Sequence, residues 1–447
     1  MTARAMIALA LLIGGCGDNL HVDDVFEATS GSRLKIEWHL YEDGTRQAET
    51  AVFYDINVHA RCTPQLWIDG AIRCVPIAED AIYIDATCDN VVGRGRAIEK
   101  PTHFIGYDAL AGTSLPARLY RAGPMATPVA QFYEKREGIC RGPFQNPSDL
   151  TYYELVDEIA GSDLVEIRDE ETGVGRLGIQ IRSTADGVSL PIGLRDRDLD
   201  AKCAPMPRED GSFQCAPIDT AVATVFHDRV CEEFAITVSD AVAVPTLARV
   251  ADPSGCARFH AVGAELSGPV FRREGEMCIR MVAVPGRRVF ALAAELDLPV
   301  LGRTIEDVSR RRLQRIVLGE GDLRFVADRL YDTATRADCQ RRTIGDAVRC
   351  LPAVVADASV LFTSSCAVEV QVAEIPQRTC EPIGFAVATT ADGMAIHAIG
   401  DRAATALYQF TGGTCQPYAG APGNVVRMLG PPIAPETFSR AVSYGER

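Results

Sequence analysis

Hydrophobic and polar residues alternate along much of the chain, as they do in β-strands with one buried face. In residues 34–40, leucine, isoleucine, tryptophan and leucine alternate with lysine, glutamate and histidine. Similar short runs lie at Ala51–Ile56, Ala81–Ala86, Leu119–Tyr120, Ala130–Tyr133 and Leu164–Ile167. Asp-Gly pairs, which favour type I′ hairpin turns, are interspersed at Asp43-Gly44, Asp69-Gly70, Asp186-Gly187, Asp210-Gly211 and Asp392-Gly393. The pattern therefore predicts an all-β fold rich in hairpins.

The cysteine spacing indicates that this pattern is repeated three times along the chain. The matched cysteines are Cys62, Cys74, Cys88 and Cys140; then Cys203, Cys215, Cys231 and Cys278; then Cys339, Cys350, Cys366 and Cys415. Their first gaps are 12, 12 and 11 residues and their third gaps are 52, 47 and 49. Such agreement predicts three copies of one unit of about 137 residues, at 33–175, 176–311 and 312–447.

Other residues recur in step with the cysteines. An Arg-Leu pair opens each unit, at Arg33-Leu34, Arg176-Leu177 and Arg312-Leu313. One aspartate follows each leucine by nine residues (Asp43, Asp186, Asp322), and another precedes the first cysteine by seven (Asp55, Asp196, Asp332). Because all units share these positions, we expect them to serve the fold, and we expect function where the units differ.

The unit length suggests how the strands are arranged. A unit with roughly eight strand-like runs fits two four-stranded blades, so three units predict a six-bladed β-propeller. The alternative is three tandem β-sandwich-like domains, although no linker rich in Pro, Ser or Gly separates the units. The stretch Thr304–Val317 has apolar residues at helical intervals, but its counterparts look extended, so a short helix there is left open.

The amino terminus predicts export. Arg4 precedes an apolar run from Met6 to Ile13, and two glycines then lead to Cys16, which is the order of a signal peptide. The run is too short to cross a bilayer as a helix. The segment Ile13-Gly14-Gly15-Cys16 resembles the lipobox of bacterial lipoproteins, which implies a signal peptide at 1–15, a lipid on Cys16 and a tether at 16–32. In one group of bacteria, sorting of lipoproteins depends on the residue after the cysteine, and the resemblance with Gly17 there implies the outer membrane.

The remaining fourteen cysteines predict a disulfide framework, since an even number in an exported chain favours bridges. The pairs Cys62–Cys74, Cys203–Cys215 and Cys339–Cys350 have the spacing that joins two arms of a hairpin. Units 2 and 3 each have a fifth cysteine, Cys256 and Cys380. Either these two join across the units or two thiols stay free.

Charge and motifs exclude several classes of function. With 45 basic and 60 acidic residues the net charge is −15, so the chain has no basic stripe for nucleic acid. It contains no Gly-x-Ser-x-Gly elbow, no His-Glu-x-x-His and no phosphate-binding loop. His260 and His397 stand where unit 1 has Tyr120, which indicates packing. We therefore predict no catalytic residue, no metal ligand and no cofactor.

The chain as a whole resembles uncharacterised cysteine-bearing β-repeat lipoproteins of Gram-negative bacteria. The sequence thus predicts a lipid-anchored, disulfide-linked, non-catalytic module that acts in binding or scaffolding at the cell envelope, with a protein or glycan as partner. Its most variable loops, Lys100–Phe104 with Tyr107 and Pro382–Phe385, are the first candidates for a ligand surface. The alternatives are a metal-dependent propeller hydrolase or lyase, with Asp55, Asp196 and Asp332 on its axis, and a structural coat protein.

Overall fold

The computed structural model describes residues 25–96, 100–110, 113–136, 138–147, 149–251, 256–275, 277–281, 285–306, 310–363, 366–390, 393–421 and 423–445. Nearly all of its regular structure is β, and the named helices are two 3₁₀ turns, Gly161–Asp163 and Pro435–Thr437. The predicted all-β fold is confirmed. The predicted signal peptide, Cys16 and the tether as far as residue 24 lie outside the described residues.

The three predicted units carry strands in the same order, and we call them segments 1, 2 and 3. Each begins with a four-stranded antiparallel meander. The meanders are β1 (Leu34–Tyr41), β2 (Arg46–Asp55), β3 (Ala60–Leu66) and β4 (Ile72–Pro76); β13 (Leu177–Thr184), β14 (Ser189–Asp196), β15 (Ala201–Pro207) and β16 (Phe213–Pro217); and β26 (Leu313–Glu320), β27 (Leu323–Asp332), β28 (Ala337–Ile344) and β29 (Ala347–Pro352).

A separate sheet, which we call a satellite, follows each meander. Satellite 1 contains β5 (Glu79–Tyr83), β6 (Val91–Gly95), β7 (His103–Leu110), β8 (Thr113–Met125), β9 (Gln131–Arg136), β10 (Ile139–Gln145) and β11 (Thr151–Ile159). Satellite 2 contains β17 (Ala221–Ala223), β18 (Val225–Phe226), β19 (Phe234–Ser239), β20 (Leu247–Ala251), β21 (Ala257–Leu266), β22 (Phe271–Glu274), β23 (Met277–Arg280) and β24 (Arg287–Glu295). Satellite 3 contains β30 (Ala356–Phe362), β31 (Glu369–Pro376), β32 (Phe385–Thr390), β33 (Gly393–Arg402), β34 (Tyr408–Thr411), β35 (Thr414–Pro417) and β36 (Asn424–Ile433).

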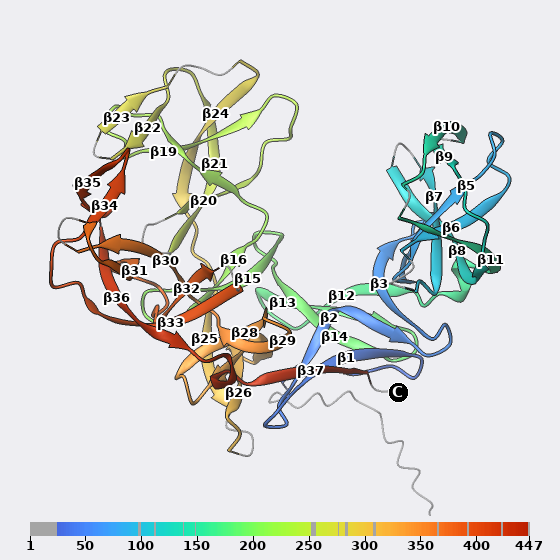
Figure 1. Ribbon diagram of the computed structural model, residues 1–447. Coiled ribbons are helices and arrows are strands. Elements are labelled where there is room, and N and C mark those ends of the chain that lie inside the picture. Colours follow the sequence, from blue (N-terminus) through green and yellow to red (C-terminus); the bar gives the residue numbers. More distant parts are fainter. Residues whose placement is uncertain are drawn as a thin grey trace, which may run out of the picture.

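The meanders join into one central sheet of 15 strands. The last strand of each segment, namely β12 (Ile167–Thr172), β25 (Val300–Glu306) or β37 (Arg440–Gly445), pairs with the first strand of another segment. The two edge strands are β4 and β12, and a single β-bridge joins Arg73 of β4 to Glu166, the residue directly before β12. The central sheet therefore closes into a ring, and Figure 1 shows β37 lying beside β1.

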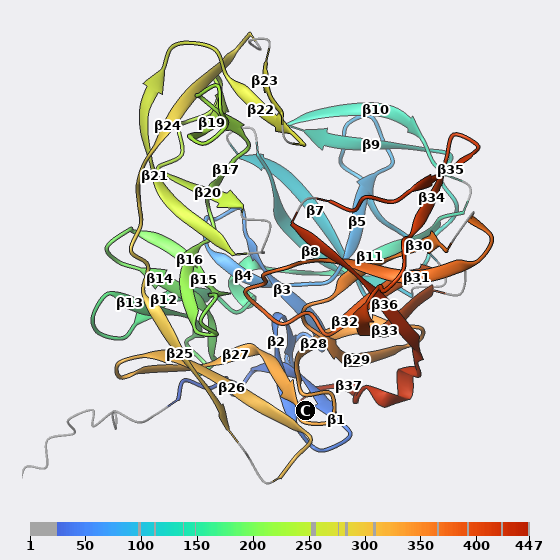
Figure 2. The same cartoon turned by 90° about the vertical axis from the view of Figure 1, so that its left-hand side faces the viewer.

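Each satellite is a small barrel of its own. In satellite 1 the order β5–β6–β11–β8–β7 returns to β5 through a parallel pair between Glu79 and Phe104. Satellite 3 closes in the same way, and in satellite 2 the short strands β17 and β18 replace β5. Figure 2 shows the three satellites standing on the same side of the central sheet.

The predicted six-bladed propeller and the tandem domains do not match these sheets. A propeller of that kind needs six four-stranded sheets, whereas the sheets contain 15, 7, 8 and 7 strands. In three tandem domains each meander would form a sheet within its own segment, whereas here all three meanders belong to one sheet. The sequence pattern did not distinguish these arrangements because alternation marks a strand without naming its partner.

Asp392 lies outside the described residues, and two of the other Asp-Gly turns differ from the type I′ geometry we expected. Only the glycine has positive φ, 81° at Gly44 and 85° at Gly70, and the preceding aspartates do not. The side chains of Asp43 and Asp69 instead accept the N–H two residues on, at 2.9 and 3.0 Å. An aspartate that stabilises the turn in this way needs no left-handed backbone of its own. The possible helix at 304–317 is likewise absent from its described part, because β25 and β26 occupy both of its ends.

Candidate functional site

The buried aspartates that recur in all three segments are occupied by arginine. Asp55, Asp196 and Asp332 are fully buried. Each accepts two or three hydrogen bonds, of 2.7–3.1 Å, from the arginine that opens its own segment, Arg33, Arg176 or Arg312. The same arginine also donates to a backbone carbonyl, that of Asp163, Asp297 or Thr437. These carboxylates are hydrogen-bonded to arginine within the fold, and they are therefore not available as ligands of the suggested axial metal ion.

The turn aspartates link one segment to another. The Asp43 carboxylate accepts the N–H of Leu313 at 2.7 Å, and Asp186 accepts the N–H groups of Arg33 and Leu34 at 2.7 Å each. The first hairpin of segment 1 thus holds the start of segment 3, and that of segment 2 holds the start of segment 1. Asp322, the third member of the set, is exposed.

The fourteen described cysteines form seven disulfides. Three join the third and fourth strands of the meanders: Cys62–Cys74, Cys203–Cys215 and Cys339–Cys350. In each satellite, one further disulfide joins a hairpin (β9–β10, β22–β23 or β34–β35) to the barrel. These are Cys88–Cys140, Cys231–Cys278 and Cys366–Cys415. The seventh, Cys256–Cys380, links satellites 2 and 3. These two cysteines therefore form a bridge across the units and are not free thiols. An oxidised cysteine cannot act as a nucleophile, and these sulfurs therefore hold the frame together.

Two of the three contacts between meanders are apolar. We call the contacts joint 1–2, joint 2–3 and joint 3–1, after the segments that meet there. Joint 1–2 buries nine residues, among them Leu34, Ile36 and Leu190. Joint 2–3 buries eleven, among them Ile179 and Phe325. Joint 3–1 buries only six, so it lacks part of the apolar core that its two counterparts have.

A single position accounts for much of this difference. In the β-ladder, Ile36 pairs with Phe53 and Ile179 pairs with Leu194. The residue in the same register of segment 3 is Arg315, which pairs with Leu330. Both isoleucines are fully buried, whereas the Arg315 side chain keeps 30% of its exposure. Arg315 forms ion pairs with Glu27 and, at 3.2 Å, with Glu306.

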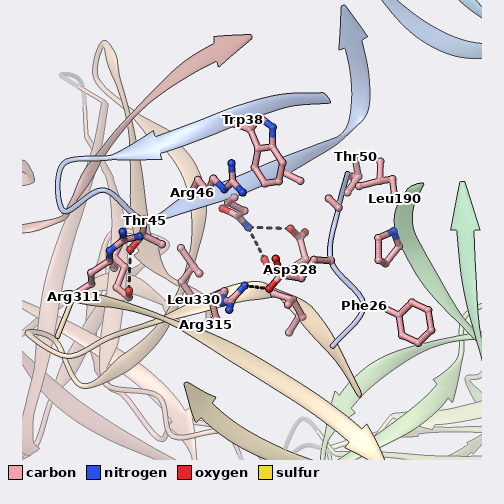
Figure 3. Close-up of a pocket in the computed structure, with 18 residues that line it drawn as sticks. Phe26, Trp38, Thr45, Arg46, Thr50, Leu190, Arg311, Arg315, Asp328 and Leu330 are labelled. Carbon is pink, nitrogen blue, oxygen red and sulfur yellow. Dashed lines mark hydrogen bonds and ion pairs between the residues drawn. The ribbon is translucent and has the colours of Figure 1, made fainter. Parts of the chain in front are cut away.

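A cavity of about 320 Å³ opens at joint 3–1 (Figure 3). Its polar wall comes from β1, β2, β26, β27 and the adjoining turns, and its apolar wall includes Phe26 and Leu190. The polar residues that line it are Glu27, Thr45, Arg46, Gln47, Thr50, Arg311, Arg315 and Asp328. The Arg46 guanidinium lies over the Trp38 ring, 4.5 Å from its centroid. The cavity thus offers donors and acceptors next to an apolar surface.

Hydrogen bonds hold the polar wall of this cavity in place. The Gln47 amide donates to the Asp328 carboxylate at 3.0 Å and accepts the Tyr41 hydroxyl at 3.0 Å. Burial raises the pKa of Tyr41 to about 12, so this hydroxyl remains a donor at neutral pH. Asp328 is exposed to solvent on this wall, and partial desolvation is the main cause that raises its pKa above the usual value. Gln47 and Asp328 are therefore fixed by the frame and do not depend on a ligand.

Glu49 ties the same joint together beside the cavity. It lies 3.3 Å from His39 of β1 and 2.6 Å from Arg341 of β28. The pKa of Glu49 is lowered to about 2, mainly by the hydrogen bond with His39. Desolvation opposes this shift, whereas the N–H of Ala51 and the charge of Arg341 lower the pKa further. The charged form of Glu49 therefore stabilises the contact between segments 1 and 3.

This contact makes the stability of the protein depend on pH. Because the folded pKa of Glu49 is lowered, its contribution is complete above the unfolded value of about 4.3 and is lost as pH falls through about 2. Glu49→Gln is expected to lower the free energy of unfolding by about 2 kcal/mol at pH 7, and by much less near pH 2. Urea unfolding across this range measures the difference, with Glu320→Gln as an exposed control. A difference that stays constant down to pH 2 would contradict this role.

The remaining predicted residues lie away from the cavity. The Nδ1 atoms of His260 and His397 donate to the carbonyls of Ala293 and Gly430, at 3.1 and 2.9 Å. They occupy the register position of Tyr120, as a packing slot requires. The Lys100–Phe104 loop leads into β7 of satellite 1, and Phe385 begins β32 and packs under satellite 3. The structure brings neither loop to the cavity.

The residues that line the cavity were not among the predicted site residues, although the sequence carries a signal for one of them. Counting two residues on from each opening leucine gives Ile36, Ile179 and Arg315, which places an arginine where two copies have isoleucine. Across the described ranges, His, Cys, Asp and Glu side chains do not gather in threes where a metal ion could be held. Within the same ranges, no helix has the length and apolar character that spanning a bilayer requires.

The model of a family of unknown function, DUF7481, matches residues 9–438. The chain belongs to this family. The match covers the three meanders and the three satellites, and it ends before β37. Comparison with curated protein sequences and with solved structures gave no significant match.

Proposed function

We propose that this protein is a threefold repeat lipoprotein of the bacterial outer membrane that binds a glycan in the cavity at joint 3–1. In this proposal the lipid on Cys16 holds the protein at the membrane. The closed central sheet and the disulfides keep the binding site rigid, and seven disulfides suit an oxidising compartment outside the cytosol. The repeat units are the predicted ones, 33–175, 176–311 and 312–447.

The observation that carries the proposal is Arg315 at a position that is isoleucine in the other two segments. An isoleucine there would extend the apolar core, since burial of such a side chain stabilises by about 1.5–3 kcal/mol. The arginine instead needs two glutamates around it and leaves a cavity beside it. Joint 3–1 has the smallest apolar core of the three joints, and it is also the joint where polar side chains line a cavity.

The cavity chemistry favours a sugar over a protein partner. Its volume, about 320 Å³, lies at the low end of ligand pockets and admits a small ligand or the end of a chain. Arginine, glutamine, aspartate and threonine side chains supply both donors and acceptors, which hydroxyl groups need. A metal-dependent hydrolase or lyase is not favoured, because Asp55, Asp196 and Asp332, which suggested it, are bonded to arginine.

Tryptophan fluorescence offers a direct test, because the chain has only two tryptophans, Trp38 at the cavity and Trp67 in a separate core. A Cys16→Ser, Trp67→Phe protein leaves Trp38 as the reporter. We expect a saturable change on titration with oligosaccharides released from the bacterial envelope. Asp328→Ala should weaken binding at least ~10-fold, as expected for a lost hydrogen bond to a charged group.

The matched control is Asp169→Ala, which removes a carboxylate that pairs with Arg182 at 2.9 Å outside the cavity. It should bind like the parent protein. Cleavage of the oligosaccharide would identify an enzyme, and equal weakening by both variants would remove the cavity from the proposal. In cells, Cys16→Ser alone should move the protein from the membrane fraction to the soluble fraction.

A further inference from the structure

A second hollow lies where satellite 1 meets the meander of segment 1. This groove has a volume of about 620 Å³. Its basic and hydroxyl side chains are Lys100, Thr102, His103 and Arg121 from satellite 1 and His59 from the turn between β2 and β3. Among the described residues that line it, none is aspartate or glutamate. Such a lining is unexpected on a chain with a net charge of −15.

The basic groups face the groove together and are not neutralised by the protein. His103 and Arg121 are directly opposed on β7 and β8, so their side chains lie on one face of the sheet. Within the described part of the chain, neither Lys100 nor Arg121 has a carboxylate within ion-pair distance. The charge of this cluster is therefore available to a ligand.

His103 adds a buried donor or acceptor to the cluster. The residue is 3% exposed, and Nδ1 lies 3.0 Å from the Thr102 hydroxyl. Its Nε2 atom is buried and has no hydrogen-bond partner among the described residues. Burial is the main cause that lowers the pKa of His103, and the charge of Arg121 adds to it. A buried nitrogen without a hydrogen-bond partner is unfavourable, and a ligand in the groove would supply the missing partner.

The other two segments show that the fold does not require these groups. The register position of the His103–Arg121 pair is held by Leu247 and Ala261 in satellite 2 and by Phe385 and Ala398 in satellite 3. Apolar pairs thus suffice to build the same barrel and to seat it on the central sheet. The basic pair is a property of satellite 1 only.

We infer that this groove binds a phosphate group, carried either by a soluble molecule or by a lipid headgroup. Arginine and lysine are the side chains that proteins use to hold phosphate oxygens, and charge-assisted hydrogen bonds are roughly twice as strong as neutral ones. The absence of carboxylates among the described lining residues removes the repulsion that an anion would meet elsewhere on this acidic chain. The site is distinct from the joint 3–1 cavity, so it does not depend on the proposed glycan binding.

The test uses inorganic phosphate and the full unacylated chain, Cys16→Ser. The chain has seven histidines, so their ring signals can be followed by NMR. We expect phosphate to shift the signals of His59 and His103 in a saturable way. Arg121→Ala should weaken binding at least ~10-fold and should fold, because the other two segments have alanine there.

Lys202→Ala is the matched control, since it removes one exposed positive charge from β15, away from the groove. Vesicles of phosphatidylcholine with and without phosphatidylglycerol distinguish the two sources of phosphate. If the protein binds the anionic vesicles and Arg121→Ala abolishes this binding, the phosphate belongs to a lipid headgroup. If the protein binds inorganic phosphate but not the vesicles, the ligand is soluble. No shift of His59 and His103, or equal weakening by Lys202→Ala, would overturn the inference. Asp328→Ala should leave phosphate binding unchanged.

Discussion

A chain that ends at Thr437 is expected to lose its cooperative fold, because β37 closes the central sheet between β1 and β29. The deletion removes Phe438, which is fully buried, and truncation of a buried phenylalanine costs about 3–5 kcal/mol. The N–H of Cys350 would also lose the carbonyl of Ser439, now at 3.0 Å. The sum is comparable with the total stability of a domain, about 5–15 kcal/mol.

Limited proteolysis and thermal unfolding measure this effect. We expect early cleavage in the β1–β2 hairpin and aggregation through the exposed edge of β1. A chain that ends at Gly445 keeps all of β37 and is the control, which should behave like the full chain. If the chain that ends at Thr437 unfolded at the same temperature as this control, the closing role of β37 would be wrong.

The second large effect is expected at the buried ion pairs. Asp196 is fully buried and binds Arg176 through two oxygens, so Asp196→Ala leaves the Arg176 charge without its main partner. Breaking a buried pair in this way costs about 3–5 kcal/mol. The loss is measured as the free energy of unfolding in urea.

The same arginine supplies its own control. Asp198 lies 3.4 Å from Arg176, but its side chain is 69% exposed, so Asp198→Ala should cost less than about 1 kcal/mol. A combined Arg176→Met, Asp196→Leu variant should recover much of the loss, because it removes both charges. Equal effects of Asp196→Ala and Asp198→Ala would mean that the buried pair is not what stabilises this region.

Local features of the fold were predictable because they depend on neighbours in the sequence. Alternation located the strand β1, although not its buried face, because Glu37 and His39 are buried as well and Leu40 is exposed. The spacing of 12 between Cys62 and Cys74 fits a hairpin, and the structure joins these residues across β3 and β4. The Asp-Gly pairs do mark turns, but the prediction of type I′ geometry was wrong because the aspartate side chain stabilises another turn.

Partners that lie far apart in the chain were not predictable. Arg33 and Asp55 were both recognised as recurring residues, yet nothing in their spacing shows that one binds the other. The same limit applies to the architecture. Strand-like runs of equal length fit a propeller blade or a shared sheet, and the choice depends on which strands pair. Here β12, β25 and β37 each pair with another segment, which joins the meanders into a ring.

By itself, the amino-acid sequence determined the β character of the chain, the threefold recurrence of its cysteines and the turns between strands. Each of these follows from contacts within a few residues or from spacing alone. The tertiary structure decided the ring of three meanders, the arginine–aspartate pairs and the two hollows. Those features depend on the register between distant strands, where one substitution, such as Arg315 for isoleucine, turns an apolar joint into a polar cavity.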